Sequence, residues 1–275
     1  MKQKRSIVLI TAFVTISFLS FAQKGIKGLV NAEKQFAFFT ASHTVKEGFL
    51  NYMDSAGVIF RQGKDINALE TYQKQKPGPG ILSWEPAFAV VSASGDLGAT
   101  TGPYEFRTKA GDTVIGRGGF SSIWRINSKG EWKNLADLGI SYNGIYPVVQ
   151  QVKEIALPKA KQPGLSYEEV LLLDKKLNTA IQEKNVGGWM QYISTDSWLN
   201  IDGQKPVTGM LQITEALQKA PGSLLLSSKN GEMSAAKDLA YIYGAVINGI
   251  KKENYLRVWI YRNNQWLAIL QTIKW

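Results

Sequence analysis

The feature that most constrains the fold of this chain is an internal repeat. The segment SASGDLGATTG at 92–102 aligns with SAAKDLAYIYG at 234–244, and Trp132 further along the chain aligns with Trp266. The offset drifts only from 142 to 134 residues, which a few loop deletions explain. Because similarity at a steady offset marks a repeated structural unit, we expect two copies of one unit of about 110 to 125 residues each.

The repeat divides the 275 residues into four predicted segments. Residues 1–22 are a predicted signal peptide, because two lysines and an arginine precede an apolar run that ends in small residues at Ala22. Residues 23–150 form the first unit, and residues 166–275 form a degenerate second unit. Between them, residues 151–165 contain prolines and lysines and are predicted to be a linker.

The predicted signal peptide indicates an exported protein, located in the periplasm or outside the cell. A retained N-terminal anchor is the alternative, but the apolar run is short for a membrane span of about 20 residues, so we expect no stable membrane anchor. The chain has no cysteine, which excludes disulfides, thiol catalysis and cysteine-based zinc sites. With one histidine in addition, we expect no metal site and no cofactor.

The net charge of +10 is spread along the chain, with lysines and arginines in ones and twos. It falls to +7 once the three positive charges of the signal peptide are removed. No run of basic residues resembles a nucleic-acid-binding stripe, so we expect no nucleic-acid partner. The charge is interpreted as a solvated basic surface, with contact to an anionic envelope surface or polysaccharide as the alternative.

Each copy begins with helical patterns and continues as strands. In the first copy Leu29, Ala32 and Phe36 recur at helical spacing, and Ser166 starts the second copy with the sequence of a capping box. Strand-like segments follow in the first copy at 81–93, 97–107, 117–127 and 132–141. The repeated stretch at 92–102 is predicted to be a tight β-hairpin and not a ligand-binding loop. Helices followed by an antiparallel meander predict an α+β fold class, with the helices packed on one sheet.

Two motifs carry a resemblance to a known family. The run GFSSIWRINSKGEWKNLAD at 119–137 and the run SGDLGATTGPY at 94–104 resemble the nuclear transport factor 2-like superfamily, which includes ketosteroid isomerase-like and SnoaL-like domains. The first copy is most similar to small exported domains of unknown function in that group. The resemblance implies two tandem cone-shaped units, each with three N-terminal helices packed on a strongly curved antiparallel sheet. It also implies an apolar cavity at the wide end of each cone.

Enzymes of this superfamily place acid–base residues inside the cavity, so we searched the first copy for such groups. Asp137, in the last strand, and Glu85, in an otherwise apolar strand, are the candidate catalytic bases, and Tyr104 is the candidate hydrogen-bond donor. The alternative is that the two acids are structural and pair with Arg125, Arg107 or backbone amides.

The second copy narrows the choice, because it carries Ser227, Val246 and Gln271 at the positions of Glu85, Tyr104 and Asp137. None of these three groups exchanges a proton near neutral pH. Any acid–base chemistry is therefore confined to the first copy. The second copy is interpreted as a scaffold or partner surface.

Aromatic residues supply the remaining candidates. The predicted ligand-binding residues are Trp84, Tyr104, Phe120, Trp124 and Asp54. Aromatic side chains give a large contact area at low entropic cost, although core packing between helices and sheet is the alternative interpretation. The single histidine, His43, is predicted to be an exposed residue between the first two helices.

The sequence is compatible with two functions, one enzymatic and one not. The first is a non-catalytic exported module that binds a small apolar or carbohydrate-like ligand in the first unit, or that associates through its sheets. The second is a small-molecule isomerase or lyase in the first unit. Because domains of this superfamily commonly pair through their sheets, we expect an internal pseudo-dimer of the two copies, in a chain that is a monomer or a homodimer.

Overall fold

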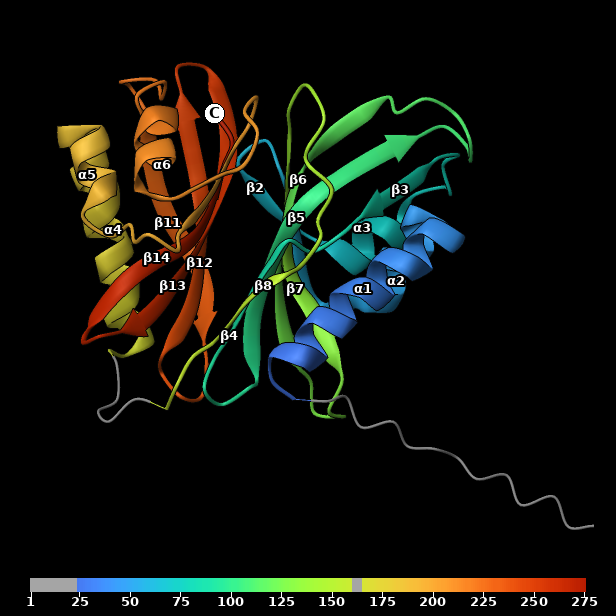
Figure 1. The fold of residues 1–275 in the computed structure, drawn as a ribbon, viewed down its shortest axis with the longest axis horizontal. Helices are drawn as coiled ribbons and strands as arrows, with labels where there is room; N and C mark the ends of the chain where they lie inside the picture. The colour runs from blue at the N-terminus through green and yellow to red at the C-terminus, as the bar shows by residue number, and fades with distance from the viewer. Residues whose placement is uncertain (1–23, 160–164) are drawn as a thin grey trace, which may run out of the picture.

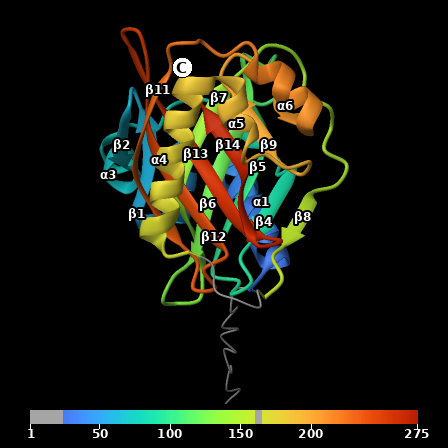
Figure 2. The same ribbon diagram turned by 90° about the vertical axis from the view of Figure 1, so that its left-hand side faces the viewer.

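The computed structural model describes residues 24–159 and 165–275. The predicted signal peptide lies outside these described residues. The described chain forms four layers, with helices on both outer sides and two sheets packed face to face between them (Figure 1, Figure 2). The predicted α+β class, with three helices on a curved sheet in each of two units, is confirmed.

The first unit forms the right-hand half of Figure 1. Its helices are α1 (Ile26–Ser42), α2 (Val45–Tyr52) and α3 (Ala68–Lys74). Its strands are β1 (Met53–Arg61), β2 (Lys64–Asn67), β3 (Ile81–Trp84), β4 (Phe88–Val91), β5 (Leu97–Arg107), β6 (Gly116–Ile126), β7 (Trp132–Ser141) and β8 (Lys153–Ala156). The strand order in the sheet is β2-β1-β7-β6-β5-β4-β8, and β3 also pairs with β5.

The second unit repeats this plan in the left-hand half of Figure 1. Its helices are α4 (Tyr167–Lys184), α5 (Val186–Met190) and α6 (Met210–Leu217). Its strands are β9 (Trp198–Ile201), β10 (Val207–Thr208), β11 (Leu225–Met233), β12 (Leu239–Asn248), β13 (Lys251–Arg262) and β14 (Gln265–Ile273). The order β10-β9-β14-β13-β12-β11 matches that of the first sheet without β8.

The sheets are mixed, whereas the sequence predicted antiparallel sheets. Strands β1 and β7 pair in parallel, and so do β9 and β14 in the second unit. The predicted linker at 151–165 also contains β8, which pairs in parallel with β4. An uncovered edge strand presents unpaired backbone groups, so a segment that passes beside it gains hydrogen bonds by adding to the sheet.

The predicted strand at 81–93 is two strands, β3 and β4, separated by a bulge at Glu85, Pro86 and Ala87. Proline has no N–H to donate to the ladder, so this bulge is where the strand can leave its register. On β5, Gly102 faces the bulge, and a Cβ there would lie 2.0 Å from the carbonyl oxygen of Glu85. The glycine is therefore required because two backbones approach closely.

Hydrogen bonds at the helix starts agree with the sequence. At the start of α4 the Ser166 hydroxyl accepts from the N–H of Glu169 at 3.3 Å, and the N–H of Ser166 donates to the Glu169 carboxylate at 2.7 Å. The predicted capping box is thus confirmed. Thr44 caps α2 by accepting from the N–H of Glu47 at 3.1 Å.

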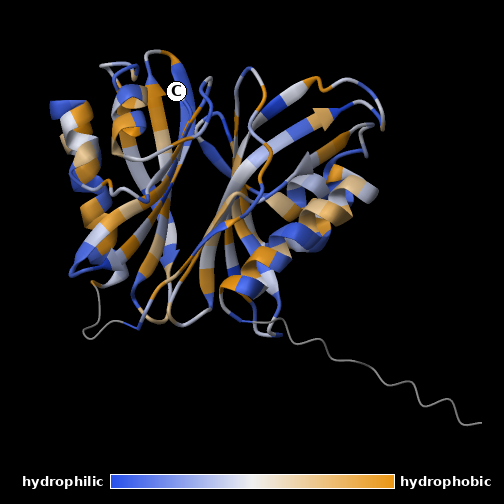
Figure 3. Cartoon of the chain, in the orientation of Figure 1, coloured by the Kyte–Doolittle hydropathy of each residue, from blue (hydrophilic) through white to orange (hydrophobic). Residues whose placement is uncertain are grey.

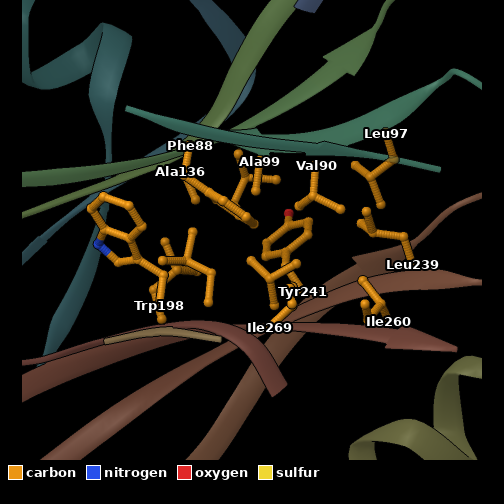
Figure 4. Close-up of a cluster of buried hydrophobic side chains, with 14 of the residues drawn as sticks. Phe88, Val90, Leu97, Ala99, Ala136, Trp198, Leu239, Tyr241, Ile260 and Ile269 are labelled. Carbon is orange, nitrogen blue, oxygen red and sulfur yellow. The ribbon is translucent and has the colours of Figure 1, made fainter. Parts of the chain in front are cut away.

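Each sheet is buried on both faces, and hydrophobic residues recur along its strands (Figure 3). One core lies between α1 to α3 and the first sheet, and another lies between α4 to α6 and the second sheet. A third core joins the two sheets. In Figure 4, Phe88, Val90 and Ala99 of the first sheet point toward Trp198 and Tyr241 of the second.

The two repeated hairpins are hydrogen-bonded to each other across the boundary between the units. The stretch at 92–97 is the predicted hairpin turn, with the N–H of Ser92 bonded to the carbonyl of Leu97 at 2.9 Å. The Asp96 carboxylate accepts from the N–H of Ala235 at 3.0 Å, and the corresponding Asp238 accepts from the N–H of Ala93 at 2.8 Å. Contacts that exchange equivalent residues in this way are those of a two-fold relationship. The stretch with the strongest repeat signal therefore joins one unit to the other.

Candidate functional site

The first unit contains a half-open cavity of about 430 Å³ between its helices and its sheet. The strands of the first sheet curve toward the side that carries α1 to α3, which creates the space (Figure 1). The cavity is lined by side chains of α1, α2, β3, β5, β6 and β7 and by one residue of the second unit: Phe36, Phe49, Leu82, Trp84, Tyr104, Phe106, Gly116, Phe120, Asp137, Gly139, Ser141 and Lys274. The wall is mainly aromatic and aliphatic.

Asp137 of β7 is the acidic group in this wall. Its carboxylate accepts from the Ser122 hydroxyl at 2.8 Å, and the Asn134 amide lies 3.5 Å away. The pKa of Asp137 is raised from 3.8 to about 7, mainly because burial disfavours its charged form. The hydrogen bond from Ser122 opposes this rise, and the nearby Glu33 carboxyl adds to it. The side chain is open to the cavity but surrounded by protein, so it lacks bulk hydration. Near neutral pH this carboxyl can therefore either hold or release a proton.

Three more of the predicted site residues line the same cavity. Trp84 of β3 stands opposite Tyr104 of β5 in the sheet, and Phe120 of β6 lies 6.2 Å from the Trp84 ring, centroid to centroid. The Tyr104 hydroxyl lies 3.4 Å from the Ser141 hydroxyl. The structure thus brings an ionisable carboxyl, a phenol and two large rings to one cavity.

The remaining predicted residues lie elsewhere. Glu85 is exposed on the bulge and outside the cavity wall, so it lacks the apolar surroundings that a buried base needs. Asp54 is buried but forms an ion pair with Arg125 at 3.2 Å, and Arg125 also bonds to Glu232 of the second unit at 2.8 Å. Trp124 is fully buried in the core.

The alternative interpretation was that the two candidate acids pair with Arg125 or Arg107. The structure shows no such pair for Asp137. Arg125 is engaged by Asp54 and Glu232, and Arg107 pairs with Glu105 at 2.5 Å, so neither arginine neutralises Asp137. His43 is exposed at the end of α1, as predicted, and stacks on Phe39 at 4.0 Å between ring centroids.

The sequence interpretation missed Glu33 of α1, which is completely buried behind the cavity. Its carboxylate accepts from Trp84 Nε1 at 2.6 Å, Thr100 Oγ1 at 2.5 Å and Trp124 Nε1 at 2.8 Å. Burial raises the pKa of Glu33, and these three donors oppose that rise. Because Trp84 lines the cavity, its bond to Glu33 fixes one edge of an aromatic ring in the cavity wall.

A signal for Glu33 was present in the sequence. It lies four residues after Leu29 and three before Phe36, so the helical period places it on the apolar face of α1. The second copy shows the same spacing, with Asp174 between Val170 and Leu177 on α4. An acid repeated on the buried face of both opening helices indicates a buried polar network.

The second unit uses the corresponding positions differently. Ser122 stands opposite Asp137 in the first sheet, and Arg257 stands opposite Gln271 in the second. Arg257 is fully buried, bonds to Asp174 at 2.6 Å and donates to the Gln271 side chain at 2.8 Å. Here the buried acid is neutralised by a cation.

In the first unit, by contrast, neither Glu33 nor Asp137 forms an ion pair within the described residues. In residues 24–159 and 165–275, no three acidic or histidine side chains gather so that they could hold a metal ion. Over the same ranges, no helix combines the length and the apolar character that crossing a membrane requires.

No family model matches the sequence, and no curated protein matches it. Solved structures do match. A protein of unknown function with a cystatin-like fold from Nostoc punctiforme is 13% identical, with a TM-score of 0.34, and the match covers 41% of this chain and 94% of that one. An NTF2-like protein of unknown function from Shewanella oneidensis is 14% identical, with a TM-score of 0.34 and coverages of 39% and 97%.

An NTF2-like protein from Cytophaga hutchinsonii is 22% identical, with a TM-score of 0.31 and coverages of 39% and 97%. Each of these three matches covers about two fifths of this chain.

Proposed function

We propose that the first unit binds a small, largely apolar ligand in its cavity, with Asp137 as the polar contact. The observation that carries this proposal is a half-open, aromatic-lined cavity of about 430 Å³ with one partly buried carboxyl, that of Asp137, in its wall. Ligand sites in proteins are typically concave and mostly apolar, with a few placed polar groups, and measure about 300 to 1,000 Å³.

Comparison with the second unit supports a functional role for the Asp137 carboxyl. It builds the same fold with Arg257 and Gln271 at the positions of Ser122 and Asp137, and its buried acid is fully paired. The fold therefore does not require an unneutralised carboxyl beside a cavity. Such a group costs stability, and natural proteins keep costs of this kind mainly where function needs them.

The test is binding of naphthalene-2-carboxamide, a neutral bicyclic probe, measured by calorimetry. We expect saturable binding by the wild-type protein and much weaker binding by Gly139→Leu, because Gly139 lines the cavity and a Cβ there has only ordinary contacts at 3.9 Å. Gly78→Leu, where a Cβ meets nothing within 4 Å, is the matched control and should bind like wild type. Equal affinity of wild type and Gly139→Leu would show that the probe does not use the cavity, and absence of binding would refute the proposal.

A second candidate function is proton transfer, as in an isomerase or lyase. It is favoured by the pKa of Asp137 near 7 and by the Tyr104 hydroxyl in the same cavity. The Asp137 carboxylate would remove a proton from a carbon next to a carbonyl group, and Tyr104 would donate a hydrogen bond to the oxygen as negative charge develops there.

Exchange of the α-protons of 2-tetralone for deuterium, followed by NMR, tests this second candidate. We expect faster exchange with wild type than with Asp137→Asn, which keeps the shape of the side chain but cannot accept the proton. The same rate for both proteins would leave ligand binding as the function.

We also propose that the protein is exported and acts as a monomer whose two repeated units take the places of the subunits of a dimer. The apolar core between the sheets and the reciprocal bonds of Asp96 and Asp238 support this arrangement. Light scattering of the purified chain should give the mass of one chain, and a stable dimer would contradict it.

A further inference from the structure

The cavity of the first unit is completed by a residue of the second unit. Lys274 follows β14 at the C-terminal end of the second sheet and lines the cavity together with residues of β5, β6 and β7. It is the one basic side chain among the described residues that line this space. The first unit therefore forms most of the cavity wall, and the second unit adds its one basic residue.

The backbone around Lys274 is held against the cavity wall. The N–H of Asp202 donates to the carbonyl of Ile273 at 3.0 Å, and the Asp202 side chain accepts from the N–H of Ser141 at 2.8 Å. The N–H of Gly203 donates to the carbonyl of Ser141 at 2.7 Å. Because Ser141 lines the cavity, these bonds tie the end of β14 to its wall.

The Lys274 ammonium forms a long ion pair with the Glu253 carboxylate, at 3.8 Å. This separation exceeds the 2.7–3.2 Å of a hydrogen bond, and 28% of each of the two side chains is exposed, so the carboxylate of a ligand can compete with Glu253 for the ammonium. The acid in the cavity wall does not prevent anion binding, since burial raises the pKa of Asp137 to about 7 and a protonated carboxyl donates a hydrogen bond to an anion.

We propose that the ligand of this cavity is an apolar acid, whose ring-sized body lies against Trp84 and Phe120 and whose carboxylate binds Lys274 of the second unit. This inference rests on the proposed ligand-binding function and names the class of its ligand. It also assigns a role to the second unit, which supplies the charge that selects for an anion.

The test compares two probes that differ only in charge, naphthalene-2-carboxylate and naphthalene-2-carboxamide, at pH 6. Wild type should bind the carboxylate about fivefold or more tightly than the carboxamide, which is the scale of a partly exposed ion pair. Lys274→Met should lose this preference and keep its affinity for the carboxamide. Lys251→Met, which removes the same charge from an exposed lysine outside the cavity wall, should keep the preference.

Salt gives an independent readout, because the preference of wild type for the carboxylate should decrease as ionic strength rises. The inference would be overturned if wild type bound both probes equally, or if Lys274→Met kept the preference for the carboxylate. In either case, binding of the carboxamide would still support the cavity as a ligand site. Binding of neither probe would refute the inference and the proposed function together.

Discussion

Replacing Asp137 with asparagine should stabilise the protein at alkaline pH and do so progressively less as the pH falls. The folded state holds the pKa of Asp137 at about 7, against an ordinary value of 3.8, because burial disfavours its charged form. A raised pKa means that the folded state binds the proton more tightly than the unfolded state does. The contribution of the protonated Asp137 carboxyl to the free energy of unfolding is therefore complete below pH 3.8, and it is lost as the pH rises to 7.

The magnitude follows from these two pKa values. Between them, each pH unit lowers the free energy of unfolding by about 1.4 kcal/mol. Above pH 7 the folded and unfolded states are both ionised, and the loss stops. The free-energy difference between Asp137→Asn and wild type should therefore grow by about 3 kcal/mol from pH 5 to pH 8. Any pH-independent effect of the substitution on the free energy of unfolding cancels when the values at two pH values are subtracted.

Urea denaturation of both proteins at pH 5, 6, 7 and 8 measures this difference. Asp196→Asn is the control, because hydrogen bonds from Lys153 and Arg262 lower the pKa of Asp196 and place its titration below this range. Its difference from wild type should stay constant from pH 5 to pH 8. If the difference for Asp137→Asn is equally constant, the carboxyl is hydrated and the argument from burial is wrong.

Two further predictions concern the framework. Arg257→Met should lower the free energy of unfolding by about 3 kcal/mol or more in chemical denaturation, since it leaves Asp174 buried without its cation, and an unchanged midpoint would contradict this. Gly102→Ala should cost about 2 kcal/mol or more in thermal unfolding, because its Cβ would lie 2.0 Å from a carbonyl oxygen, whereas Gly78→Ala should stay within about 0.5 kcal/mol of wild type.

The site was only partly predictable from the sequence. Two β-bulges explain why the predicted and observed directions of its strand side chains differ. Regular alternation of side chains along β7 would place Asp137 on the same face as Leu135, two residues earlier. A bulge opposite the step from Ile123 to Trp124 shifts the register, so Leu135 enters the core between the sheets while Asp137 lines the cavity. An extra residue in a strand reverses the facing of its neighbours, and period-two reasoning cannot locate it.

A bulge also changes the direction of the Glu85 side chain, in this case away from the cavity. Its alternation with apolar residues indicated an inward position, but the bulge around Pro86 turns it to solvent. Glu33, by contrast, could be read from helical spacing, since a helix has no such irregularity along its apolar face.

The sequence alone determined the local structure and the repeat. Capping residues, helical spacing and hairpin turns depend on neighbours along the chain, and the predicted capping box, opening helices and hairpin are confirmed. The order of elements in the second unit is consistent with the predicted repeat. Only the tertiary structure decided which polar groups meet. Lys274 and Tyr104 are 170 positions apart, yet they line one cavity, because the curvature of one sheet and its packing on the other set their positions. Such contacts depend on the summed geometry of many strands, and no local pattern encodes that sum.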